Sequence, residues 1–95
     1  MMRDDVSIVL IGTLDTKGPE IAYVRDRIRD AGARAIVIDS GILGEANGIV
    51  ADVSRSDVAI AAGHTIEEAR NAGSRGAAVE IMAEGVREIC LRLYR

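Results

Sequence analysis

The sequence predicts an α/β fold, a Rossmann-like parallel sheet with flanking helices, to which it contributes two strands and three to four helices. The composition, with 48% hydrophobic and 28% charged residues in 95, is that of a globular domain. Two runs rich in β-branched residues, Val6–Gly12 and Ala35–Asp39, suit strands buried on both faces. A helical apolar pattern separates them, and a strand, a helix and a second strand in that order predict a right-handed parallel crossover.

The first helix is expected after the polar segment Thr13–Glu20. Pro19 fits the first helical turn, where a missing N–H does no harm, and Gly32 is a natural C-terminal stop. The apolar positions recur at steps of three and four residues, as one face of a helix requires. These positions are Ile21, Val24, Ile28 and Ala31.

After the second strand, residues 40–53 form a long glycine-containing loop, with a short extended piece expected at Ile49–Val50. Two capping patterns then predict short helices, because each places an acid three residues after a hydroxyl. They begin at Ser54 and at Thr65.

From Ser74 to about Leu93 the apolar spacing predicts a long helix that packs on a sheet rather than in a coiled coil. Two strands are few for an independently stable sheet. We therefore expect residues 1–95 to be the N-terminal part of a single nucleotide-binding-type domain in a larger protein, or a chain that completes its sheet with a second copy.

Charge and cysteine content exclude several classes of function. The net charge is −3, both signs are interspersed, and two tyrosines are the only aromatic residues, so we expect no nucleic-acid partner. The single cysteine, Cys90, and the single histidine, His64, predict neither a disulfide nor a metal site. An acidic start and a short apolar run predict no signal peptide and no membrane segment, which makes the cytoplasm the expected location.

The turn Gly12–Gly18 is the main candidate site, because ligands of open α/β sheets bind where a strand meets a helix N-terminus. Thr13 and Thr16 offer hydroxyls, Asp15 a carboxylate and Lys17 a positive charge. The spacing is neither that of a Walker loop nor that of the dinucleotide fingerprint. The alternative is that Asp15 and Thr16 only cap the helix and that Lys17 is solvated.

Asp39 completes the set of expected ligand-binding residues, because nucleotide-binding crossovers place an acid against the ribose at this position. The alternative is an aspartate that bonds its own loop backbone. Ser54 is a helix cap rather than a nucleophile, since no histidine or second cysteine is placed to activate it.

Five segments of the chain carry a resemblance to a known family. They are Ile8–Gly18, Ala51–Arg55, Arg75–Gly76, Ala78–Glu80 and Met82–Gly85. Together they resemble the family of the tomato inhibitor of tobamovirus RNA replication. The resemblance implies a longer chain of two α/β domains whose first domain binds ATP, with Thr13, Asp15, Thr16 and Lys17 lining the nucleotide site.

The sequence thus favours a nucleotide-binding domain, with ATP and magnesium as the expected ligands. Two alternatives stay open. One is an enzyme that acts on a phosphorylated or carboxylated metabolite, and the other is an oligomerisation or interaction module built on the long helix.

Overall fold

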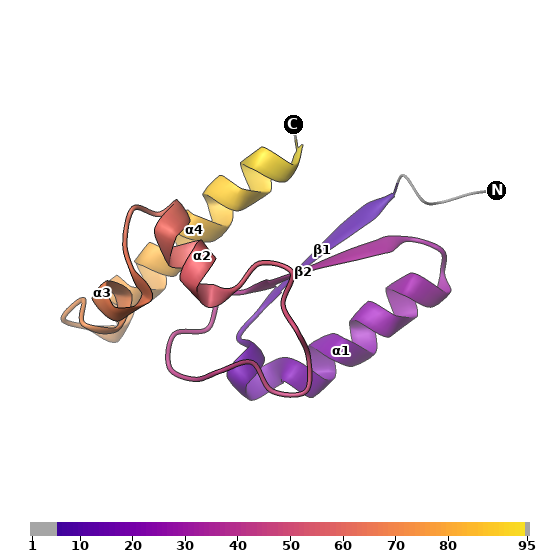
Figure 1. Cartoon of the computed structure of the whole chain (residues 1–95), viewed down its shortest axis with the longest axis horizontal. Helices are drawn as coiled ribbons and strands as arrows, with labels where there is room; N and C mark the ends of the chain where they lie inside the picture. Colours follow the sequence, from indigo (N-terminus) through magenta and orange to yellow (C-terminus); the bar gives the residue numbers. More distant parts are fainter. Residues whose placement is uncertain (1–5, 95) are drawn as a thin grey trace.

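Two parallel strands, β1 (Ser7–Gly12) and β2 (Arg34–Asp39), form the sheet in the computed structural model, which describes residues 6–94 (Figure 1). Helix α1 (Leu14–Asp30) connects them, so the predicted α/β class and crossover are confirmed. The register pairs Gly12 with Asp39. The carboxyl ends of both strands therefore lie side by side at one end of the sheet, where a ligand site was expected.

Helix α1 begins at Leu14, earlier than the sequence pattern suggested, and is kinked at Lys17, where φ is −116° and ψ is 15°. The kink has a chemical cause, because Pro19 lacks an N–H and its ring crowds the preceding turn. Pro19 therefore lies in the first turn of the longer, second part of the helix. Gly32, with φ of 87°, adopts the left-handed conformation that ends the helix.

The loop after β2 differs from the prediction, because Ile49–Val50 is not an extended strand piece. Ile49 is instead buried against α1, while Val50 is 86% exposed. The extended contact falls at Val53, which forms a single parallel bridge to Ile38 on the outer side of β2.

Three helices follow, α2 (Arg55–Ala61), α3 (Ile66–Arg70) and α4 (Arg75–Tyr94). Both predicted caps are confirmed: Ser54 Oγ accepts the N–H of Asp57 at 3.2 Å, and Thr65 forms a reciprocal capping box with Glu68. Within residues 6–94, no helix has both the length and the apolar character needed to span a bilayer.

The core lies on both faces of the sheet. On one face, α1 covers a cluster of Leu14, Val37 and Ile49. On the other face, Ile38 packs with side chains of α2 and α4, among them Val58 and Met82. Helix α4 packs chiefly against α2 and α3 and reaches the sheet through this second cluster.

Candidate functional site

The turn between β1 and α1 holds its hydroxyls close together. The N–H groups of Thr16 and Lys17 donate to the carbonyl oxygen of Thr13, at 3.2 and 2.8 Å. Thr13 Oγ1 lies 3.0 Å from Thr16 Oγ1, and both residues are exposed. Thr13 occupies the N-cap position of α1, but its side chain caps no amide. Both hydroxyls therefore remain accessible from solvent.

Asp39 provides the side-chain cap of α1. Its carboxylate oxygen Oδ1 accepts the N–H of Leu14 at 3.2 Å and that of Gly41 at 2.8 Å, and the residue is only 3% exposed. The bond to Gly41 is the loop-backbone bond of the alternative interpretation. An internal carboxylate thus occupies the place beside the α1 N-terminus where a bound anion was expected.

Asp15 lies beneath the glycine-containing loop that follows β2. A methyl group added at Gly41 would lie 3.2 Å from Asp15 Oδ1, and one added at Gly44 would lie 3.3 Å from Oδ2. The loop therefore packs directly against this carboxylate. Arg55 also holds this loop, donating to the carbonyl oxygen of Gly44 and to the carboxylate of Glu45.

Lys17 does not join the other residues of the predicted set. Its Nζ lies 3.7 Å from Glu20 Oε2, on the exposed surface of α1, with 64% of its side chain accessible. The structure therefore brings together Thr13, Asp15 and Thr16, and leaves Lys17 on the outside of the turn.

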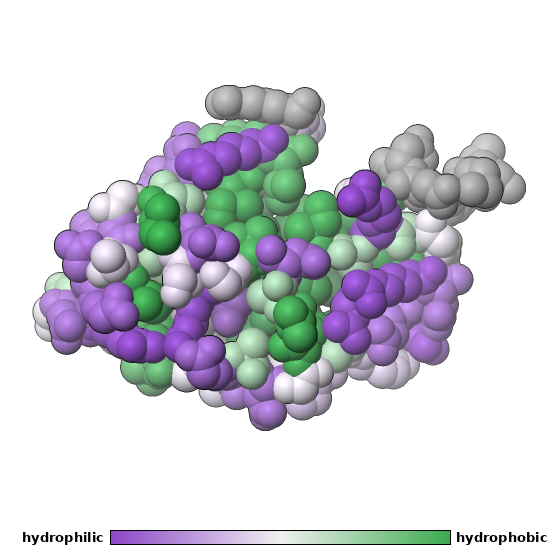
Figure 2. Space-filling model, viewed as in Figure 1, coloured by the Kyte–Doolittle hydropathy of each residue, from purple (hydrophilic) through white to green (hydrophobic). Residues whose placement is uncertain are grey.

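A groove of about 1040 Å³ opens between this turn and the start of α4. Its polar side chains come from the turn, from the loop after β2 and from the junction of α3 with α4. They are Thr13, Asp15, Thr16, Ser40, Arg70, Asn71, Ser74 and Arg75. The remainder of the groove is apolar, and Figure 2 shows apolar surface gathered between α4 and the sheet.

Arg70 and Arg75 were missed by the sequence analysis, although one signal was available. Helix α4 has no acid in its first turn and begins with Arg75, an arrangement that opposes the helix dipole. Ser74 caps the helix by accepting the N–H of Ala77 at 3.0 Å. Arg70 Nε donates to the carbonyl oxygen of Ile42 at 2.9 Å, which fixes the guanidinium at the groove.

The charged and hydroxyl groups that line the groove come from two parts of the fold. Two guanidinium groups come from α3 and from the start of α4, and Asp15 with two threonine hydroxyls comes from the turn between β1 and α1. Among the described residues no three His, Cys, Asp or Glu side chains cluster as a metal cage. The arrangement suits a ligand with both an anionic part and hydroxyl groups.

Comparison with known proteins identifies relatives along nearly the whole chain. A UPF0261 protein of Clostridium tetani is 41% identical over 88 residues, which cover 93% of this chain and 22% of that protein. UPF0261 proteins of Brucella suis and Brucella melitensis are each 41% identical over 78 residues, covering 82% of this chain and 18% of theirs. The chain therefore spans about a fifth of the length of these curated relatives. No solved structure matches it.

These findings correct the resemblance drawn from the sequence. The relatives carry the UPF0261 name, and nothing links the chain to the tomato inhibitor of tobamovirus replication, so that assignment is wrong. The motifs that suggested it, such as the Gly12–Gly18 turn, lie within the region that the matching family model covers, residues 6–95. Residues 6–95 match the model of the family's N-terminal domain, and the chain belongs to the uncharacterised protein family UPF0261.

Proposed function

We propose that this chain is a nucleotide-binding domain, with ATP and its magnesium ion as the ligand. With the tomato family set aside, the proposal rests on geometry. The observation that carries it is that Arg70 and Arg75 line the same groove as Thr13 and Thr16, at the point where β1 ends. The carboxyl ends of parallel strands are where open α/β sheets bind their ligands.

The phosphate groups belong on the α4 side of the groove. Guanidinium groups bind phosphate oxygens through paired hydrogen bonds, and a helix N-terminus adds backbone donors and a favourable dipole. Arg70 uses Nε on Ile42, which leaves its two terminal nitrogens for a ligand. The N-terminus of α1 is a poorer anion site, because the Asp39 carboxylate already accepts the N–H of Leu14 there.

Asp15 is the residue that we expect to hold the magnesium ion. A phosphate oxygen and a carboxylate repel each other unless a cation lies between them, and Mg²⁺ takes one or two carboxylates together with phosphate oxygens and water. Asp15 is a single half-buried carboxylate in the groove, which fits this mixed set of ligands. The threonine hydroxyls on the same turn, 3.0 Å apart, are donors or acceptors for a sugar hydroxyl.

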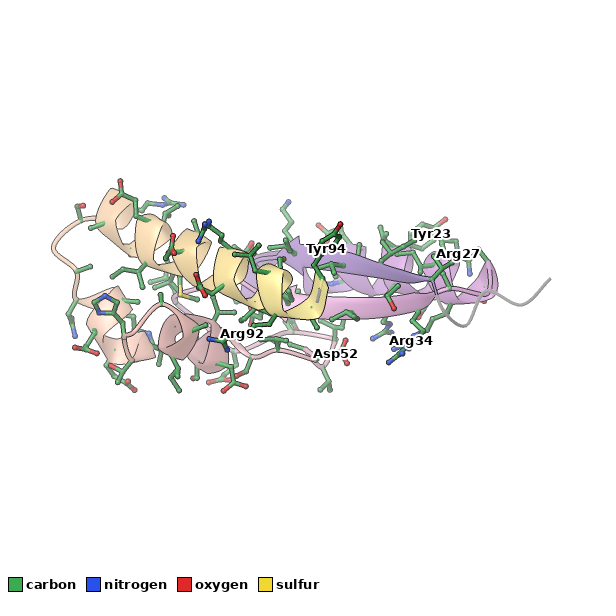
Figure 3. All side chains as sticks on the ribbon, turned by 90° about the horizontal axis from the view of Figure 1, so that it is seen from above. Tyr23, Arg27, Arg34, Asp52, Arg92 and Tyr94 are labelled. Atoms are coloured by element: carbon green, nitrogen blue, oxygen red, sulfur yellow. The ribbon has the colours of Figure 1, made fainter. Side chains whose placement is uncertain are left out.

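Calorimetric titration with MgATP, adenosine and inorganic phosphate tests the proposal. We expect MgATP to bind and Arg75→Ala to weaken its affinity about tenfold or more, the loss of a charge-assisted contact. The matched control is Arg92→Ala, because Arg92 lies on the same helix but near its other end (Figure 3). Equal affinity in the two variants would overturn the proposal. Binding of phosphate as tight as that of MgATP would favour the metabolite enzyme instead.

A further inference from the structure

The outer edge of β1 presents unpaired backbone groups. At the two ends of the ladder, the N–H of Arg34 donates to the carbonyl oxygen of Val6 and that of Ser40 to Gly12. Even-numbered residues of β1 thus direct their backbone polar groups toward β2. Because successive residues alternate, the odd-numbered residues Ser7, Val9 and Ile11 direct theirs to the other edge, which no described strand pairs.

An apolar trough lies beside this edge. It consists of Ile11 from β1 and, from α4, Val79, Met82 and Val86. Ile11 is 47% exposed and Val79 is 52% exposed, and both values are high for apolar residues on a strand and on the helix that covers the same face of the sheet. The surface is the apolar part of the groove, and it is continuous with the unpaired edge of β1.

The direction of the strand connections indicates where a strand that follows α4 would lie. The crossover from β1 through α1 to β2 moves in one direction across the sheet, with α1 on one face. Helix α4 lies on the opposite face, with Met82 against Ile38. A right-handed connection that leaves β2 and passes through α4 must therefore cross the sheet in the opposite direction. It passes β1 and places the next strand on the unpaired side of β1.

The direction of α4 agrees with this topology. Its first residue, Arg75, lines the same groove as Thr13, beside the carboxyl end of β1. From there it runs back toward the end where the strands begin, and Figures 1 and 3 agree on this course. A strand that follows α4 would therefore run parallel to β1.

We propose that the edge of β1 and the apolar trough under α4 bind a parallel β-strand, supplied by the polypeptide that follows the matching region in the full-length relatives. The matching family model describes an N-terminal domain, and the Clostridium tetani relative, of which the chain covers 22%, has ample sequence for such a strand. The strand fills the apolar part of the groove, and its carboxyl end reaches the polar part beside Thr13. The proposal does not depend on the identity of the ligand.

Amide hydrogen exchange tests the proposal on two proteins, this 95-residue chain and the intact Clostridium tetani relative. We expect the amides of Ser7, Val9 and Ile11 to exchange rapidly in this chain. The aligned amides of the relative should exchange at least about a hundredfold more slowly. Comparable rates in the two proteins would overturn the proposal. Protection of these amides that rises with the concentration of this chain, together with a dimer in sedimentation, would also overturn the proposal. In that case a second copy of the chain would pair with the edge of β1.

A substitution pair gives a second, independent readout. Val79→Asp places a charge in the trough, and Ile60→Asp places one outside it, on α2, where Ile60 is 63% exposed against 52% for Val79. In a full-length hybrid, in which residues 6–95 replace the matching segment of the relative, Val79→Asp lowers Tm by several degrees more than Ile60→Asp. In the 95-residue chain the two variants have equal Tm. If Val79→Asp and Ile60→Asp lowered Tm by the same amount in the hybrid as well, that result would contradict the proposal. If the hybrid does not fold, the hydrogen-exchange comparison decides.

Discussion

The buried carboxylate of Asp39 accepts the backbone N–H of Leu14, 3.2 Å away, and so ties the end of β2 to the start of α1. The same oxygen accepts the N–H of Gly41, which fixes the beginning of the following loop. Asp39 is therefore a positioning residue for the turn that carries Thr13 and Asp15.

Replacement of Asp39 lowers stability. We expect Asp39→Ala to cost about 2–4 kcal/mol in free energy of unfolding, because it leaves two amides without their charged acceptor in a buried position. Asp39→Asn keeps one acceptor oxygen and should cost about half as much. Urea unfolding measures both. A loss below about 0.5 kcal/mol for the alanine variant would show that these bonds do not hold the turn.

Close backbone packing between α2 and α4 makes Gly85 intolerant of a side chain. A methyl group at this position would lie 1.9 Å from the carbonyl oxygen of Val58. We expect Gly85→Ala to destabilise the chain by about 1–3 kcal/mol through overpacking. Gly76→Ala on the same helix is the control, because its methyl group would meet nothing nearer than Ser74 Oγ at 3.9 Å. Thermal unfolding that ranks the two variants in the opposite order would contradict the packing described here.

Arg55 fixes the loop that covers Asp15. Its side chain is 11% exposed and joins α2 to Gly44 and Glu45, so Arg55→Ala should speed amide exchange across residues 41–50 and cost about 1–3 kcal/mol. Arg87→Ala removes only exposed contacts within α4 and should cost no more than about 0.5 kcal/mol. If exchange in the loop were the same in both variants, the loop would not depend on Arg55.

The proposed role of Asp15 as a magnesium ligand predicts that its replacement removes the magnesium dependence of ATP binding. In the unmodified chain, affinity for ATP should fall when Mg²⁺ is removed by a chelator, because the cation no longer bridges phosphate and carboxylate. In Asp15→Asn the affinity should be about the same with and without Mg²⁺. Fluorescence titration of a labelled ATP measures both values. A magnesium effect of unchanged size in the variant would assign the cation to other ligands.

The sequence predicted those features that depend on neighbouring residues. The apolar runs marked both strands, and Ser54 and Thr65 marked two helix starts, because strand burial and capping follow from side chains a few positions apart. Pro19 likewise belongs to a first helical turn, and the kink at Lys17 explains why α1 nevertheless begins earlier.

Features that depend on distant residues were not predictable in the same way. Local sequence could not choose between the two interpretations of Asp39, since its partner Leu14 lies 25 residues away. The presence of Arg70 and Arg75 in one groove with Thr13 depends on how α3 and α4 pack, and no spacing rule encodes that packing. Lys17 met the compositional expectation for a phosphate turn, yet the helix kink directs it toward Glu20.

The most direct test of the central claim is an amide chemical-shift map of this chain titrated with MgATP. We expect saturable shifts concentrated at Thr13, Asp15, Thr16, Ser40, Ser74 and Arg75, with little change at Lys17 or at the far end of α4 near Arg92. Shifts confined to other surfaces, or none at millimolar MgATP, would contradict it.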